Sequence, residues 1–213
     1  MEATRLRERY SDQITILIGF ESEWIRTALD DGIEDTNTSS SALVRKLQGK
    51  HGQVLDFFVG SVHHVHRVPV DYSRELYLQA RATANEIDKD RKSEEEDEAA
   101  GEAAGGHPDE VLFRDYFDAQ YDMLRTLKPP IIGHFDLIRL YSDRSNDSMR
   151  SQARVWQRVM RNLEFIAGYG GILEINSSAV KKGLAEPYPQ LDICKVRFPS
   201  PFTIEYLPKI PAN

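Results

Sequence analysis

The sequence contains a single cysteine, Cys194, among 213 residues, so an intrachain disulfide is excluded. Proteins of reducing compartments rarely need disulfides, and we therefore expect a cytoplasmic location. No stretch approaches the roughly 18 consecutive apolar residues of a membrane-spanning helix. The first residues include acidic side chains and no apolar core, which argues against a secretory signal or a transit peptide. No membrane partner is predicted.

The chain also lacks an excess of charge outside one segment. Ten acidic and three basic residues lie between Asp88 and Glu110, and they account for the whole net charge of −7. The remainder of the protein is neutral, so neither nucleic acid nor an anionic membrane surface is predicted as a partner. The segment 88–108 is acidic, rich in Ala and Gly and free of aromatic and β-branched residues. This composition predicts a disordered surface insertion.

Local signatures of nucleophilic catalysis and of phosphate-binding glycine loops are missing. What the sequence does contain is an alternation of short apolar runs with longer amphipathic segments. Apolar runs that predict strands buried on both faces occur at 14–21, 57–62, 131–138 and 172–176. Segments that predict helices occur at 71–87, 109–127 and 154–166. Such alternation favours an α/β fold with a parallel sheet or barrel.

Polar residues gather at the C-terminal ends of the predicted strands. They are Glu21, His63 with His64, His134 with Asp136, and Glu174 with Asn176. In a barrel the C-terminal strand ends converge on one mouth, where such folds keep their active sites. A glutamate converging with two or three histidines has the composition of a metal site. Taken singly, Glu21 would also suit a solvated strand end.

Alternation of side chains along a strand separates the histidine candidates. His63 and His64 are adjacent and point to opposite faces, and we favour His63 as ligand because it shares a face with Ser61. His134 and Asp136 share a face, which suits a metal ligand and a carboxylate that orients it. A core histidine paired with an acid would give the same pattern.

Several segments together resemble one known family. They are GFESE at 19–23, FVGSVHHVH at 58–66, KPPIIGHFDLI at 128–138, RNLEFIAGYGGILEINSSAVKK at 161–182 and EPYP at 186–189. In this order they resemble the histidinol-phosphatase branch of the polymerase-and-histidinol-phosphatase (PHP) family. The resemblance runs from about residue 3 to residue 195, interrupted by the acidic insertion.

The resemblance implies a distorted (β/α)7 barrel with a trinuclear centre of divalent metal ions (Zn, Mn or Fe). The implied reaction is hydrolysis of a small-molecule phosphomonoester, L-histidinol phosphate, to L-histidinol and phosphate in histidine biosynthesis. By motif, Glu21 is similar to a bridging carboxylate of the family, and His63 and His134 are similar to its histidine ligands.

Candidates for contact with the substrate and its phosphate are His64, Arg161, Asn176, Lys181 and Lys182. All of them lie in or beside segments that carry the resemblance. The same residues would also suit barrel-rim and surface positions. The sequence gives no prediction of the oligomeric state.

The sequence also departs from the family pattern. Members open with a His-x-His strand and a Thr-Glu-His strand, and they close with a strand that supplies an Asp and a His. None of these is found here, and residues 196–213 form a divergent C-terminal tail. We therefore expect a partial PHP domain over 1–195, with a barrel that lacks its first strands and its last metal-binding strand. Two hypotheses follow: a histidinol-phosphatase of reduced competence, or a non-catalytic barrel remnant that acts as a binding or oligomerisation module.

Overall fold

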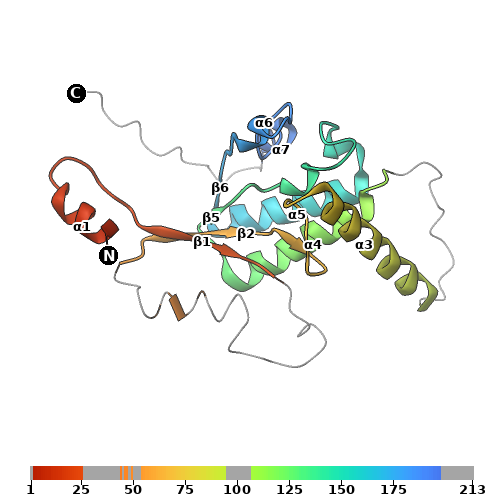
Figure 1. The fold of residues 1–213 in the computed structure, drawn as a ribbon, viewed down its shortest axis with the longest axis horizontal. Coiled ribbons are helices and arrows are strands. Elements are labelled where there is room, and N and C mark those ends of the chain that lie inside the picture. The colour runs from red at the N-terminus through yellow and green to blue at the C-terminus, as the bar shows by residue number, and fades with distance from the viewer. Residues whose placement is uncertain are drawn as a thin grey trace.

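A parallel four-stranded sheet organises the computed structural model of the chain (Figure 1). The structure describes residues 2–25, 54–94 and 107–197, together with the single positions 44, 46, 47 and 49. The strands are β1 (Gly19–Glu23), β2 (Phe57–Ser61), β5 (Ile131–Ile132) and β6 (Ile172–Leu173), arranged in the order β1-β2-β5-β6. The predicted α/β fold with a parallel sheet is thereby confirmed.

The strand register brings the polar strand ends to one edge of this sheet. Glu21 lies opposite Val59 between β1 and β2, and Gly60 lies opposite Ile132 between β2 and β5. Ile132 in turn lies opposite Leu173 of β6. Because all four strands run in the same direction, the residues that follow them lie together at the C-terminal ends of the strands.

The described residues also form helices, of which the three longest carry much of the buried core. The helices are α1 (Glu2–Arg9), α3 (Arg74–Glu94), α4 (Glu110–Leu127), α5 (Ala153–Tyr169), α6 (Ser178–Lys181) and α7 (Leu191–Cys194). Two 3₁₀ turns, η2 (Leu137–Arg139) and η3 (Met149–Ser151), and a hairpin of β3 (His64–Val65) with β4 (Val68–Pro69) complete the described elements. In Figure 1, α1 and α3 lie at opposite ends of the molecule.

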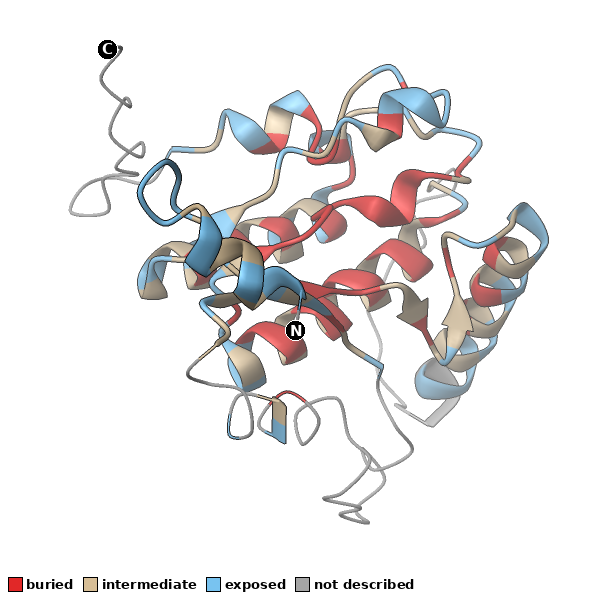
Figure 2. Ribbon diagram, turned by 60° about the vertical axis from the view of Figure 1, so that its left-hand side comes forward, coloured by how far each residue is buried: buried red, intermediate tan, exposed pale blue. Residues whose placement is uncertain are grey.

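Helix α4 forms the centre of the core. It packs against β2, α3 and α5, and its apolar period produces one continuous buried face. The buried residues of this face are Leu112, Phe113, Tyr116, Phe117, Ala119, Gln120, Met123 and Leu124. Figure 2 shows buried residues on the strands and on the helix faces that turn toward them. Among the described residues, no helix is long and apolar enough to cross a membrane.

The predicted strand at 14–21 is wrong in its first half. β1 begins at Gly19, and the preceding Ile14 and Leu17 are 57% and 62% exposed rather than buried. Side chains occupy the backbone groups that a strand would pair. Arg7 Nε donates to the carbonyl of Ile16 at 2.9 Å, and Asp56 Oδ2 accepts the N–H of Ile18 at 2.6 Å. These bonds hold the segment outside the sheet.

The strands predicted at 131–138 and 172–176 are much shorter than expected. β5 ends at Ile132, because Gly133 leads into His134 with a left-handed φ of 24° and then into η2. His134 and Asp136 therefore do not alternate along one strand, and the expectation that they share a strand face is wrong. β6 likewise ends at Leu173, so Glu174 and Asn176 lie beyond it.

The disorder predicted for 88–108 is wrong at its beginning. Residues 88–94 continue α3, which runs without interruption to Glu94. The charged residues of this stretch include good helix formers, and Arg114 Nη2 of α4 holds Asp88 Oδ1 at 2.6 Å. Residues 95–106 and the tail from 198 onward lie outside the described part of the chain.

Candidate metal centre at the strand ends

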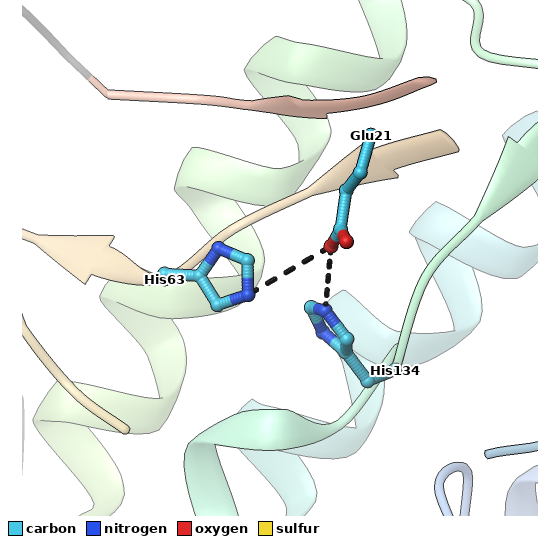
Figure 3. Close-up of side chains that lie close together, drawn as sticks. All are labelled: Glu21, His63 and His134. Carbon is cyan, nitrogen blue, oxygen red and sulfur yellow. Dashed lines mark hydrogen bonds and ion pairs between the residues drawn. The ribbon is translucent and has the colours of Figure 1, made fainter. Parts of the chain in front are cut away.

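Three predicted residues meet where the strands end (Figure 3). Glu21 lies in β1, His63 follows β2, and His134 follows β5. The parallel register of the three strands places them side by side although they are widely separated in sequence. We refer to these three residues as the strand-end triad.

The carboxylate of Glu21 is the common neighbour of both imidazoles. Its Oε1 lies 3.1 Å from His134 Nε2 and 3.9 Å from His63 Nε2, and one potential ligand atom from each residue lies within 4.8 Å of the others. The two imidazole rings are tilted by 52° with centroids 4.7 Å apart. Two imidazole nitrogens and a carboxylate oxygen that face one another are a donor set suited to Zn²⁺ and related divalent ions.

The protonation states of Glu21 and His63 also suit a cation. The hydrogen bond with His134 is the largest effect that lowers the pKa of the Glu21 carboxyl from 4.5 to about 2; Ser61 contributes in the same direction, while burial opposes both. Burial lowers the pKa of the His63 imidazole, and the neighbouring His134 ring lowers it further. At neutral pH, Glu21 is therefore ionised and His63 is uncharged, the forms that bind metal ions.

Ser61 and Gly133 support the position of Glu21. Ser61 is 1% exposed, and its Oγ donates to Glu21 Oε1 at 2.5 Å. Gly133 makes room for this hydroxyl, because a Cβ at residue 133 would lie 2.6 Å from Ser61 Oγ. The sequence placed Ser61 on the same strand face as His63 but gave no indication of its bond to Glu21.

Glu174 supports the unusual backbone of His134. Its Oε2 accepts the backbone N–H of His134 at 2.9 Å, at the residue where the chain adopts a positive φ. The buried Nδ1 of His134 has no hydrogen-bond partner among the described residues. In the sequence, Glu174 stands out only as a polar strand end, and no pattern there indicates its bond to the backbone of His134.

Asp136 does not orient the His134 ring as predicted. Its Oδ2 accepts hydrogen bonds from Arg139 Nε at 3.0 Å and from the backbone N–H of Gln190 at 2.9 Å. Among the described residues, no hydrogen bond joins this carboxylate to the imidazole of His134, and its Oδ1 is buried without a partner. The reason is the turn after β5, which carries Asp136 into the core together with Arg139.

Arg161 is occupied elsewhere. Its guanidinium binds Asp118 Oδ1 at 2.9 Å and the carbonyl of Phe117 at 3.1 Å, and it stacks over the Tyr121 ring at 4.1 Å. All of these partners belong to α4, so Arg161 joins α5 to α4. Within the described residues, no hydrogen bond or ion pair connects it with the triad.

The other predicted substrate residues lie nearer to the strand ends. His64 follows His63 directly, and its Nδ1 contacts Glu23 Oε1. Asn176 Oδ1 caps the turn before α6 by accepting the N–H of Ser178 at 2.9 Å. Lys181 and Lys182 end this short helix with exposed side chains. In the described structure none of the last three is bonded to the triad.

The chain is similar to known proteins over most of its length. The PHP domain family matches residues 2–178. A Schizosaccharomyces pombe protein named "Probable histidinol-phosphatase" is 40% identical over 190 residues, covering 89% of this chain and 51% of that protein. A Saccharomyces cerevisiae protein named "Histidinol-phosphatase" is 28% identical over 218 residues, covering 91% and 56%. The chain thus spans about half the length of these relatives. The family match covers most of its residues, and the chain belongs to the PHP domain family.

Proposed function

We propose that this protein is a metal-dependent histidinol-phosphatase, which hydrolyses L-histidinol phosphate to L-histidinol and phosphate in histidine biosynthesis. The observation that carries the proposal is the strand-end triad, in which Glu21, His63 and His134 converge. The names of the two relatives support this substrate over a non-catalytic remnant. A cytoplasmic location agrees with the single free cysteine, Cys194.

The triad would hold a divalent ion, Zn, Mn or Fe. When bound, such an ion polarises phosphate oxygens and lowers the pKa of water so that hydroxide is available near neutral pH. The chain's own contribution is to keep Glu21 anionic and fixed by Ser61, and to keep His63 uncharged by burial. Catalytic zinc sites commonly use three protein ligands and one open position, so the three donors suit one ion of the trinuclear centre that the family resemblance implies.

Residues near the triad are proposed to contact the substrate. His64 adjoins His63, and Asn176, Lys181 and Lys182 follow Glu174, which holds the backbone of His134. The exposed ammonium groups of the two lysines suit a phosphate dianion. Arg161 is left out of this proposal because its guanidinium already binds residues of α4.

The four parallel strands are proposed to belong to the distorted (β/α)7 barrel of the PHP family. Their spatial order follows their order along the chain, as a barrel wall requires. The triad would then lie at the C-terminal mouth of the barrel, where such folds carry their active sites.

The test is phosphate release from L-histidinol phosphate with added Mn²⁺ or Zn²⁺, together with a count of bound metal per chain. The wild-type protein should bind metal and release phosphate, and Glu21→Gln should lose both properties. Glu164→Gln is the matched control, because Glu164 is exposed on α5 and, within the described residues, no hydrogen bond or ion pair joins it to the triad. Metal binding without any phosphate release would favour the non-catalytic module instead.

A further inference from the structure

Glu23 is a second carboxylate beside the strand-end triad. It lies two residues after Glu21 in β1, so both side chains leave the same face of the strand. Its Oε1 lies 3.9 Å from His63 Nδ1 and also contacts Nδ1 of His64. Neither the strand-end pattern nor the family resemblance assigned a role to this residue.

The His63 ring lies between two glutamates. Its Nε2 faces Glu21 Oε1 at 3.9 Å, and its Nδ1 faces Glu23 Oε1 at the same distance. A neutral imidazole has one protonated nitrogen and one nitrogen with a free lone pair. A histidine that binds metal usually donates its other ring N–H to a carboxylate or carbonyl, which fixes the tautomer and the ring orientation.

We propose that Glu23 is a positioning residue for the metal centre, which holds His63 with its proton on Nδ1 and its Nε2 lone pair directed toward Glu21. This inference rests on the proposed metal-dependent function. The distance of 3.9 Å is closed by a small rotation of either side chain or by one bridging water. The Glu23 side chain is 38% exposed, and its buried Oε1 lies between Nδ1 of His63 and Nδ1 of His64.

The neighbouring ligand provides a contrast. His134 Nδ1 is buried without a hydrogen-bond partner in the described structure, and the nearby Asp136 carboxylate binds Arg139 and Gln190. Among the described residues of the triad, His63 is therefore the histidine whose second nitrogen faces a carboxylate. Glu23 supplies the orienting group that the sequence had led us to expect at Asp136.

A purely structural role for Glu23 predicts a different pattern. Its Oε1 contacts His64 at the beginning of β3, so it also connects β1 to the β3–β4 hairpin. If this connection were its main role, removal of either partner would have the same effect. His64→Phe removes the hairpin contact and leaves Glu23 free to approach His63, so it separates the two roles.

The experiment compares wild type, Glu23→Gln, His64→Phe and the control Glu164→Gln by calorimetric titration with Zn²⁺. We expect Glu23→Gln to weaken Zn²⁺ binding about 10- to 100-fold, the usual cost of losing an orienting group. His64→Phe and Glu164→Gln should bind within about threefold of wild type, well short of that loss. Equal weakening by Glu23→Gln and His64→Phe, or no weakening by Glu23→Gln, would overturn the proposal.

A second readout needs no metal. The ¹⁵N shifts of the His63 ring, recorded above the ordinary pKa of histidine, should show the proton on Nδ1 in wild type and a change of tautomer in Glu23→Gln. A tautomer that does not respond would overturn the role of Glu23 even if Zn²⁺ binds well. Wild-type protein that binds no Zn²⁺ would instead overturn the proposed metal centre, and the ring shifts would still decide whether Glu23 orients His63.

Discussion

His134 and Asp136 are separated by one residue, yet they belong to two clusters of different character. Asp136 and Arg139 form a buried ion pair, 0% and 2% exposed, in which opposite charges meet. Arg139 also donates to the carbonyls of Ser145, Glu186 and Pro187. His134, by contrast, joins the strand-end triad, in which two imidazoles approach one carboxylate. A buried atom without a hydrogen-bond partner among the described residues occurs in both clusters, His134 Nδ1 in one and Asp136 Oδ1 in the other.

The difference indicates which cluster serves the fold and which serves a ligand. A buried ion pair that also bonds the backbone of other segments ties these segments together, and its opposite charges are already matched. A set of electron-pair donors that converge on one point is satisfied only when a cation or a proton lies between them. The following predictions test this division, beginning with the largest expected effect.

Replacement of Arg139 by Met should be the most destabilising change. It leaves the buried carboxylate of Asp136 without its cation and three carbonyl groups without a donor. Loss of one partner of a buried ion pair costs about 3–5 kcal/mol. Chemical denaturation should show a decrease of this size in the free energy of unfolding.

The control for this change is Arg125→Met. Arg125 pairs with Asp122 on the surface of α4, and its side chain is 58% exposed. Exposed pairs contribute about 0–1 kcal/mol, so this variant should unfold almost as wild type does. If Arg139→Met were equally harmless, the Asp136–Arg139 pair would not be a structural cluster.

Replacement of Glu21 by Gln should weaken metal binding strongly and change the stability of the fold little. Loss of an orienting group costs about 10- to 100-fold in metal affinity, so loss of a ligand oxygen should cost more than about 100-fold in the Kd for Zn²⁺. The stability of the metal-free protein should change little, because Glu21 is half exposed and Gln still accepts the hydroxyl of Ser61. Calorimetry and denaturation on the same sample measure both quantities. If Glu21→Gln destabilised the protein and left the affinity for Zn²⁺ unchanged, the role of Glu21 would be structural.

Replacement of Gly133 by Ala should have a smaller effect on stability and on metal binding. Gly133 lies in the turn after β5 that leads to both His134 and Asp136. The added Cβ would lie 2.6 Å from Ser61 Oγ and 3.0 Å from Val59 Cγ1, so the β2 side chains must shift. Overpacking of this kind costs about 1–3 kcal/mol, and displacement of Ser61 should also weaken Zn²⁺ binding. Gly168→Ala is the matched control: it lies in α5 with nothing within 4 Å of its Cβ and should be neutral or slightly stabilising.

The elements that a local pattern decides could be predicted from the sequence. The apolar run at 57–62 predicted β2, and the helical period of 109–127 predicted α4. The positions of Glu21, His63 and His134 at strand ends predicted that they lie close together. These outcomes depend on alternation, helical period and the common direction of parallel strands. Each of them can be judged from a short window of the chain.

The features that depend on a partner elsewhere in the chain could not be predicted from the sequence. Asp136 turns inward because Arg139 and the backbone of Gln190, 54 residues later in the chain, receive it. The segment at 14–18 leaves the sheet because Arg7 and Asp56 occupy its backbone. Such contacts form only when the chain is folded, so the periodicity of the sequence does not predict them.

The smallest expected effect distinguishes two histidines that behave alike toward protons. Burial is the main cause that lowers the pKa of both His63 and His107 below 6.5. Each folded imidazole resists protonation, so each contributes stability above pH 6.5 that is lost as the pH falls through and below this value. NMR titration should therefore give both midpoints below the ordinary value, with no difference in direction.

Zn²⁺ should separate these two histidines. His107 accepts the backbone N–H of Asp109 at Nδ1 and packs against Phe113, whereas His63 faces Glu21 and His134. Addition of Zn²⁺ at neutral pH should shift the ring signals of His63 and leave those of His107 in place. Equal shifts at both rings would mean that a buried neutral imidazole is sufficient for binding, because His107 Nε2 also has no hydrogen-bond partner among the described residues. A shift at His63 alone would show that the convergence of donors, rather than the pKa of one ring, makes the site.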